Sequence, residues 1–354
     1  VADTASIANF KYNNGTDPEN SQYTFPSKNI SLFAENSFFL NDKWSVTPGA
    51  RYEFISTETD GYFNRYLIGL NGDTLDVLHS ENASNKNRHI FLAGLGLSYR
   101  LKKAGKFTAN FSQNFRSVNF SDINILIPNF KVDPDIDDES GYNIDLTYNK
   151  TFGKKAFIGA TGYYLYYANR IGIIWQVDPE TFNTYQFRTN VSASRTMGLE
   201  LSAWTDIAQL TSMNDSTQKL NVSAAITMTD AKYIEEDAIV YGNSVEMVPA
   251  LTVKSGVTYE YKNFLVSGVL NFQTKQFSES TNAEKSLTGV YGIIPSFYVV
   301  DAKVGYTYKK FMFQVSVNNV TDHMYFTQRA NSYPGPGIIP SEGRTVFGSV
   351  IINL

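Results

Sequence analysis

Apolar and polar residues alternate with a period of two along most of this chain. In residues 251–261, for example, Leu251, Val257 and Tyr259 fall on one face, and Lys254 falls on the other. Such alternation predicts a β-strand with one apolar and one polar face. The segments with this pattern are residues 29–40, 44–56, 89–101, 106–116, 141–150, 156–168, 196–205, 220–229, 251–261, 264–274, 297–308, 311–320 and 345–354. About thirteen such strands, with no helical period between them, are typical of a membrane β-barrel.

The apolar face of each predicted strand is expected to meet lipid, and the polar face is expected to line the interior of the barrel. The outward residues include Tyr142, Ile144, Leu146 and Tyr148; Leu220, Val222, Ala224, Ile226 and Met228; and Val300, Ala302, Val304, Tyr306 and Tyr308. The inward residues include Asp145, Thr147, Asn221, Ser223, Thr227, Asp301, Lys303 and Thr307.

The connections between the predicted strands alternate between short and long. The short ones are residues 41–43, 102–105, 151–155, 262–263 and 309–310, and the long ones are residues 57–88, 117–140, 169–195, 230–250, 275–296 and 321–344. Only residues 206–219 break the alternation. Outer-membrane barrels have short periplasmic turns and long extracellular loops, whereas a β-sandwich has mostly short loops without strict alternation. We therefore predict an all-β fold, an antiparallel transmembrane β-barrel in the bacterial outer membrane.

Composition agrees with this prediction. No apolar run approaches the roughly 18 residues that a transmembrane helix needs, so the chain would cross a membrane with strands. Aromatic residues make up 14% of the chain, which suits the aromatic girdles of such barrels. The absence of cysteine excludes disulfides and thiolate metal sites. The net charge of −4 gives no support for nucleic-acid binding.

Residues suited to catalysis are scarce and scattered. The histidines are His79, His89 and His323, and no motif places an acidic partner beside them. Because a hydrolase needs nucleophile, base and orienting group in one constellation, we predict that the protein is not an enzyme. We also predict no metal site or cofactor. The acidic residues within 133–139 lack the glycine and final glutamate of an EF-hand and are expected to form a solvated loop.

The number of strands leaves two alternatives open. Bacterial single-chain barrels have an even number of strands. Thirteen strands that end in the periplasm would place Val1 outside the cell. Either the chain is a fragment of a longer barrel, or one strand escapes the pattern.

The sequence near the C-terminus is more specific. The segment Val-Asn-Asn-Val-Thr-Asp-His-Met-Tyr-Phe at 317–326 resembles a segment near the end of TonB-dependent receptors. Residues 328–338 and 342–349 resemble their last loop and last strand. The segments similar to the ferric dicitrate type of receptor, especially its Bacteroidetes versions, are residues 44–53, 115–121, 195–200, 241–243 and 248–249.

The resemblance implies a barrel of about 22 strands, filled by an N-terminal plug domain, that takes up scarce ligands with energy relayed by TonB. Residues 1–354 would then be the C-terminal portion of the barrel, with the plug domain and the early strands absent. Leu354 departs from the family, in which an aromatic residue is usual at the end. The implied partners are outer-membrane lipid, a ferric chelate such as ferric citrate, and TonB, which would act through the missing N-terminal part.

The resemblance also implies ligand-binding residues. In the family a glutamine follows one of the central strands, and Gln176 is the best match. The last long loop contributes an asparagine, for which Asn331 is the nearest candidate, with Arg329 and Tyr333 beside it. Arg116 is a further candidate, because a guanidinium pairs with carboxylates through two parallel hydrogen bonds. The alternative is that Arg329 and Arg116 only form ion pairs at the extracellular rim.

These observations together predict an outer-membrane receptor that transports a ferric chelate. One alternative is a TonB-dependent receptor for another siderophore, an oligosaccharide or a peptide. A saccharide receptor would favour stacked aromatic side chains over arginines at its mouth. An alternative of another class is a surface barrel that transports nothing and binds a partner through its loops.

Overall fold

The structure is a computed structural model. It describes residues 2–6, 9–12, 21–69, 71–102, 104–119, 130–153, 155–177, 179, 184–210, 217–285, 289–330 and 337–352. The chain divides into two compact units. The first comprises Val1–Phe33, Arg51–Phe91 and Asn119–Ser121, and the second comprises Ala34–Ala50, Leu92–Val118 and Asp122–Leu354.

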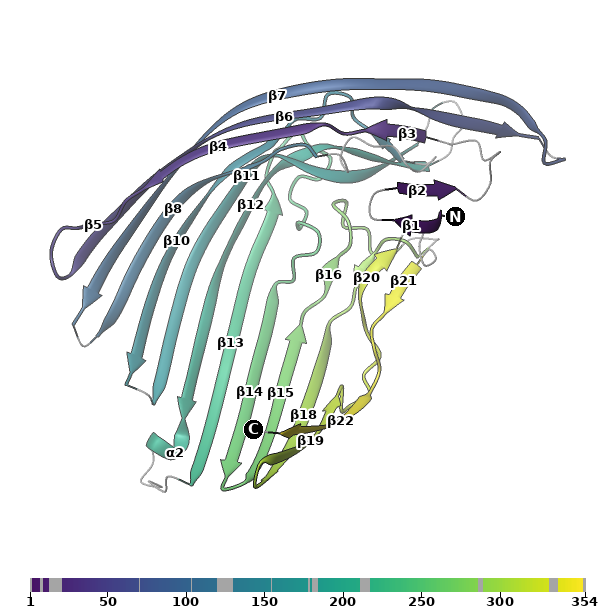
Figure 1. The fold of residues 1–354 in the computed structure, drawn as a ribbon. Helices are drawn as coiled ribbons and strands as arrows, with labels where there is room; N and C mark the ends of the chain where they lie inside the picture. Colours follow the sequence, from purple (N-terminus) through teal and green to yellow (C-terminus); the bar gives the residue numbers. More distant parts are fainter. Residues whose placement is uncertain are drawn as a thin grey trace. The chain divides into compact units, whose positions relative to one another are not determined.

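The second unit is built on one antiparallel sheet, in which β10 to β15 lie side by side in chain order (Figure 1). Its strands are β8 (Gly105–Arg116), β10 (Glu139–Phe152), β11 (Ala156–Val177), β12 (Thr184–Asp206), β13 (Gln218–Tyr233), β14 (Leu251–Tyr261), β15 (Phe264–Gln273), β18 (Phe297–Tyr308), β19 (Phe311–Asn318) and β22 (Thr345–Ile352). Each of these strands pairs with the next in antiparallel fashion. The prediction of an all-β, antiparallel fold is confirmed.

Shorter elements surround this sheet in the second unit. They are β5 (Phe38–Phe39), β9 (Phe130–Val132), helix α2 (Ile207–Leu210), and the hairpins of β16 (Gln276–Phe277) with β17 (Ile293–Ile294) and of β20 (Phe326–Ala330) with β21 (Gly337–Pro340). Strand β9 runs parallel to β12 at residues 186–188. No helix among the described residues is long and apolar enough to cross a membrane.

The first unit also consists of strands. Strands β1 (Ala2–Ser6) and β2 (Asn9–Tyr12) form a hairpin, and β3 (Ser21–Thr24) pairs with residues 60–63 of β6 (Trp44–Ile68). The remaining strands with residues in this unit are β4 (Ser27–Glu35) and β7 (Thr74–Leu101). His89 Nδ1 lies 2.7 Å from the hydroxyl of Tyr52, and His79 Nδ1 lies 2.7 Å from Asn64 Oδ1. Both histidines of β7 therefore form side-chain hydrogen bonds with residues of β6.

Two of the predicted long connections are largely strand. The prediction of connections at residues 57–88 and 169–195 is wrong in this respect, because β6 and β7 leave only residues 69–73 between them, and β11 and β12 extend to Val177 and from Thr184. The alternation of apolar and polar residues ends where one face no longer meets lipid. The backbone hydrogen bonds continue beyond that point, because they do not depend on side-chain polarity.

The strand register keeps the predicted outward residues on one face of the sheet. Val222 lies opposite Val257, and Val266 lies opposite Val304. The exposed fraction is 47% for Val257 and 50% for Val304, as expected of side chains that meet lipid. On the polar face, the hydroxyls of Thr258 and Ser267 lie 3.0 Å apart on neighbouring strands.

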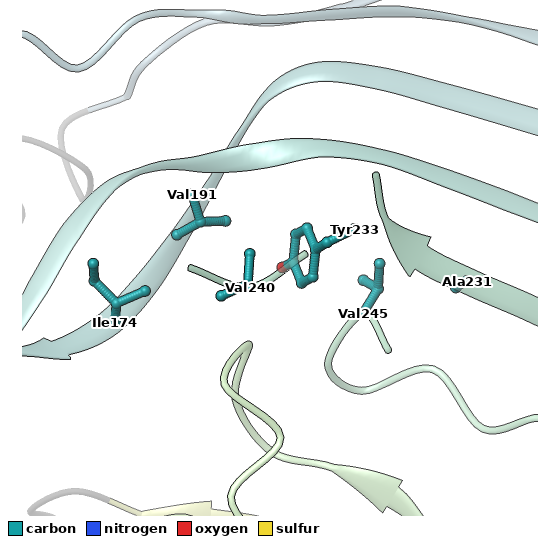
Figure 2. Close-up of a cluster of buried hydrophobic side chains, with 6 residues drawn as sticks. All are labelled: Ile174, Val191, Ala231, Tyr233, Val240 and Val245. Carbon is teal, nitrogen blue, oxygen red and sulfur yellow. The ribbon is translucent and has the colours of Figure 1, made fainter. Parts of the chain in front are cut away.

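A compact hydrophobic core lies under the loop of residues 234–250, beside the ends of β11, β12 and β13 that are far from the short turns. It consists of Ile174, Val191, Ala231, Tyr233, Val240 and Val245. Figure 2 shows the ring of Tyr233 between Val240 and Val245. Tyr233 is fully buried and Val240 is 1% exposed, so this loop is folded onto the strands.

The acidic segment at residues 133–139 is not simply a solvated loop. Asp133 accepts hydrogen bonds from the Thr189 hydroxyl and the Asp135 amide, and Asp138 accepts the Val118 amide at 2.7 Å. The sequence expectation was wrong for Asp133 and Asp138, because they accept hydrogen bonds from a side-chain hydroxyl and from backbone amides of the protein.

Candidate ligand-binding site

A cavity of about 260 Å³ lies among the loops of the second unit. Four separate parts of the chain line it: the neighbouring strands β11 and β12, the loop after β13, the segment around the β16–β17 hairpin, and β20. The lining residues are Ile171, Gly172, Ile173, Trp175, Gln186, Arg188, Glu246, Ser278, Glu279, Ser280, Val290, Tyr291 and Arg329. Tertiary structure therefore assembles the site from residues that lie up to 158 positions apart.

Arg329 lines the cavity and also holds one of its walls. Its Nη1 donates to the carbonyl of Gly289 at 2.6 Å, and its Nη2 donates to the carbonyl of Ile293 at 2.8 Å. Its guanidinium lies 5.1 Å from the centre of the Phe326 ring, within cation–π range. Burial lowers the pKa of the Arg329 guanidinium from its usual value, although an arginine still carries its charge at neutral pH. The Nε atom is buried, with no hydrogen-bond partner.

Arg188 and Gln186 bring polar groups to the cavity from one strand. Both line it, and they lie two residues apart on β12, so their side chains point to the same face. Gln186 is only 9% exposed. The parallel strand β9 pairs with this stretch, and the amide of Asp133 donates to the Arg188 carbonyl at 2.8 Å. The backbone that carries Arg188 is therefore fixed on both sides by strands.

Gln176 lies outside the lining of the cavity. It stands opposite Tyr185 in the β11–β12 pair, and its Oε1 accepts the Tyr185 hydroxyl at 2.7 Å. Its neighbour Trp175 lines the cavity, and successive side chains of a strand point to opposite faces. Trp175 packs near Tyr291, with ring centres 5.2 Å apart, so the two aromatic rings form one side of the site.

Arg116 also lies outside the lining. Its Nη1 donates to Glu139 Oε1 at 3.0 Å, and the same oxygen accepts the Ile171 amide at 2.8 Å. The Glu139 side chain is 7% exposed and that of Arg116 is 36% exposed. This geometry matches the alternative reading of Arg116 as an ion-pairing residue, which here joins β8, β10 and β11. Asn331 and Tyr333, the other two predicted site residues, lie outside the described residues.

Glu246 contributes a carboxylate whose position is fixed by two neighbouring side chains. Its Oε2 accepts the Tyr233 hydroxyl at 2.6 Å, and its Oε1 lies 4.0 Å from Arg170 Nη2. Glu279, the other carboxylate of the lining, bends back to its own loop and accepts the Thr281 amide, the Thr281 hydroxyl and the Ala283 amide. Both carboxylates are therefore engaged with protein donors.

The two loops that border the cavity are tied to each other and to the strands. Asn282 Oδ1 accepts the Ser244 amide at 2.7 Å, and Asn282 Nδ2 donates to the Ser244 carbonyl at 2.8 Å. The Ser280 hydroxyl donates to the Ile173 carbonyl at 2.9 Å. These hydrogen bonds hold the two loops against each other and against β11, so they fix the walls of the cavity.

The charges around the cavity favour an anionic ligand rich in oxygen. The guanidinium groups of Arg188 and Arg329 and the carboxylates of Glu246 and Glu279 give the lining a formal charge of zero. Arg170, outside the lining, lies 4.0 Å from Glu246 and offsets part of its negative charge. Because both carboxylates already accept hydrogen bonds, they oppose an incoming anion less than free carboxylates would. Within the described part of the chain, no group of three or more His, Cys, Asp or Glu side chains is arranged to hold a metal ion.

Sequence reasoning missed most of these residues. Arg188, Glu246 and Tyr291 fall in predicted connections, where no alternation marks a face. Only the family-like segments at 241–243 and 248–249, on either side of Glu246, could have drawn attention to that loop.

Solved structures of a transporter and of two receptors resemble this fold. The ferric citrate transporter FecA in its unliganded form is 22% identical, with a TM-score of 0.72, over 96% of this chain and 47% of that chain. The siderophore receptor PiuA from Acinetobacter baumannii is 18% identical, with a TM-score of 0.68, over 93% of this chain and 44% of that chain. The ferric-catecholate import receptor Fiu from E. coli K12 is 15% identical, with a TM-score of 0.69, over 93% of this chain and 45% of that chain.

At these identities the likeness shows the fold, and the chain spans about half the length of each of these proteins. The sequence match is broader. The family model described as "TonB dependent receptor-like, beta-barrel" matches residues 3–320. The chain therefore belongs to the TonB dependent receptor-like β-barrel family, and its strands form part of the wall of a bacterial outer-membrane barrel.

Proposed function

We propose that this chain forms the ligand-binding wall of an outer-membrane receptor that takes up a ferric chelate of the ferric citrate kind, with energy supplied through TonB. One observation carries the proposal. Arg188 of β12 and Arg329 of β20 line the same cavity. Citrate bound to iron presents carboxylate oxygens, and guanidinium groups are the side chains best suited to pair with them.

The size of the cavity supports a compact ligand. A volume of about 260 Å³ is slightly below the roughly 300–1,000 Å³ of typical small-molecule sites. A small ferric chelate suits this volume better than an oligosaccharide chain. The likeness to the ferric citrate transporter FecA and the dicitrate-like sequence segments favour the same ligand.

The Trp175–Tyr291 pair supports a second candidate. Two aromatic rings with centres 5.2 Å apart at a cavity wall could stack against a sugar or an aromatic siderophore. This candidate predicts that binding depends on the rings and hardly at all on Arg188.

Ligand titration of the protein expressed from its complete gene tests both candidates. If ferric citrate is the ligand, Arg329→Ala and Arg188→Ala should each weaken its binding about 10- to 100-fold, which corresponds to the loss of a charge-assisted hydrogen bond. Arg188→Lys should restore only part of the affinity, because an ammonium cannot reproduce the planar fork of a guanidinium. Calorimetry with ferric citrate, a ferric catecholate and a maltooligosaccharide measures these effects.

Lys309→Ala is the matched control, since Lys309 lies in a two-residue turn between β18 and β19, far along the strands from the β16–β17 and β20–β21 hairpins. If Arg188→Ala, Arg329→Ala and Lys309→Ala all bind ferric citrate as the parent does, the cavity is not the ferric citrate site. Saccharide binding that is lost in Trp175→Ala and kept in Arg188→Ala would establish the second candidate instead.

A further inference from the structure

A second hollow, of about 310 Å³, lies on the apolar face of the sheet across β10 to β13. Its lining includes the small side chains of Ala160, Ala203 and Ala224 and the larger side chains of Tyr148, Leu201 and Ile226. The strand register places these residues in two neighbouring rows. Tyr148, Ala160, Leu201 and Ile226 stand opposite one another, and so do Lys150, Ile158, Ala203 and Ala224. All of them therefore share the outward face.

The hollow lies close to the short turns. The Tyr148 hydroxyl donates to the carbonyl of Ala104, in the turn between β7 and β8, and the Tyr148 ring lies 4.7 Å from the Phe107 ring. The side of the hollow that Tyr148 forms is therefore fixed. Short turns of outer-membrane barrels face the periplasm, so the hollow opens to the periplasmic half of the bilayer.

A cation stands at the turn end of this hollow. Lys150 is opposite Ile158, one row nearer the turns than Tyr148, and its Nζ lies 4.5 Å from the centre of the Phe152 ring. A Cβ built on Gly105 would meet both the Lys150 Cβ and the Tyr148 ring, which confirms that the two side chains leave the sheet on the same face. A lysine in this place extends toward the lipid headgroups, where phosphate is its natural partner.

We propose that this hollow binds one phospholipid of the periplasmic leaflet, with an acyl chain lying over Ala160, Ala203 and Ala224 and the phosphate at Lys150. The volume is about ten times the ~30 Å³ of one water molecule, a size close to that of a methylene group. It therefore holds much of one acyl chain. Water is a poor occupant, because the lining carries almost no polar surface. The proposal does not depend on the identity of the transported ligand.

Native mass spectrometry tests the proposal on the protein expressed from its complete gene, equilibrated with mixed micelles of phosphatidylglycerol and phosphatidylethanolamine. The parent should retain one phospholipid, with phosphatidylglycerol preferred. Ala203→Leu should lower the retained fraction on the order of ten-fold, since the larger side chain displaces about two methylene groups of the lipid. Lys150→Gln should lower the preference for phosphatidylglycerol by about three- to five-fold, as expected for one lost cation near an anionic lipid.

Two matched variants serve as controls. Ala109→Leu adds the same side chain elsewhere on the outward face, where Ala109 lies between Leu97 and Leu146. Lys262→Gln removes a cation from another short turn, where the Lys262 Nζ lies 5.1 Å from the Tyr261 ring. Both should behave as the parent. Heat-modifiable gel mobility should show that all four variants fold.

Several outcomes would overturn the proposal. Equal lipid retention by Ala203→Leu and the parent, or equal loss in Ala109→Leu, would mean that the hollow is ordinary barrel surface. Unchanged lipid retention together with an unchanged lipid preference in Lys150→Gln would remove the contact between Lys150 and the headgroup. Retention of lipopolysaccharide in place of phospholipid would put the hollow in the outer leaflet, and a dimer that Ala203→Leu dissociates would make a second copy the occupant.

Discussion

The membrane-facing part of the sheet and the loop-built cavity of the second unit are stabilised in different ways. In β13, β14, β15 and β18 the register is continuous, and large apolar side chains such as Val257 and Val304 remain about half exposed. Around the cavity, Tyr233 is fully buried, and Glu139, Glu246 and Arg329 bond to backbone or side-chain groups of distant segments.

This difference indicates which amino-acid substitutions each region should tolerate. The sheet depends on backbone hydrogen bonds and on the polarity of its outward face, so most apolar exchanges there should be tolerated. The loop region depends on packing and on individual polar contacts, in the manner of a small soluble core. Three predictions can break or sharpen this comparison.

The largest effect is expected from Tyr233→Ala. Removal of a fully buried aromatic side chain costs about 3–5 kcal/mol in soluble cores, and the loop of residues 234–250 should detach from the strands. Limited proteolysis of the folded protein should then cut within this loop, while the heat-modifiable mobility of the barrel stays unchanged. Tyr233→Phe keeps the packing and removes only the hydroxyl that Glu246 accepts, so it should give a much smaller effect. A barrel that fails to fold in Tyr233→Ala would contradict the separation of the two regions.

The next effect in size is expected from Val257→Arg or Val304→Arg. An arginine on the lipid face near the bilayer centre costs about 2–4 kcal/mol. Folding into lipid vesicles, followed by gel mobility over a urea series, measures the loss. Asn271→Arg places the same charge on the opposite face of β15, which is polar and is expected to tolerate it. Parental stability in both valine variants would show that the outward face is wrongly assigned.

The smallest effect in these three predictions is expected from Arg116→Ala, at about 1.5–3 kcal/mol of local stability, the worth of a hydrogen bond to a charged group. The lower part of that range is expected, because the Arg116 side chain is partly exposed. The loss should appear as faster amide hydrogen exchange at the loop ends of β8, β10 and β11. Glu139→Gln combined with Arg116→Ala should recover part of the protection, since it removes the buried charge that Arg116 leaves behind. If Arg116→Ala leaves exchange unchanged and weakens ligand binding, Arg116 acts on the ligand after all.

Alternation of residue types was enough to determine the sheet. It indicated which residues of β10, β13 and β18 face lipid and which short turns join the strands, because in an outer-membrane barrel every residue of a spanning strand meets either lipid or the interior. It failed where the strands leave the bilayer. There the strands β11 and β12 continue as a hairpin with polar and apolar residues on both faces. Alternation in the sequence therefore no longer predicts a strand in this part of the chain.

Only the tertiary structure decided the candidate site. Arg329 contacts Gly289, forty positions away, and the Ser280 hydroxyl bonds to the Ile173 carbonyl, 107 positions away. No local pattern encodes such contacts. Gln176 shows that a difference of one residue along a strand decides whether a side chain reaches the cavity. A side-chain period of two means that a shift of one residue exchanges the faces of a strand, so Trp175 lines the cavity while Gln176 bonds to Tyr185 outside it. The sequence by itself determined a family and a lipid-facing wall, and the folding of the loops onto that wall decided which side chains meet a ligand.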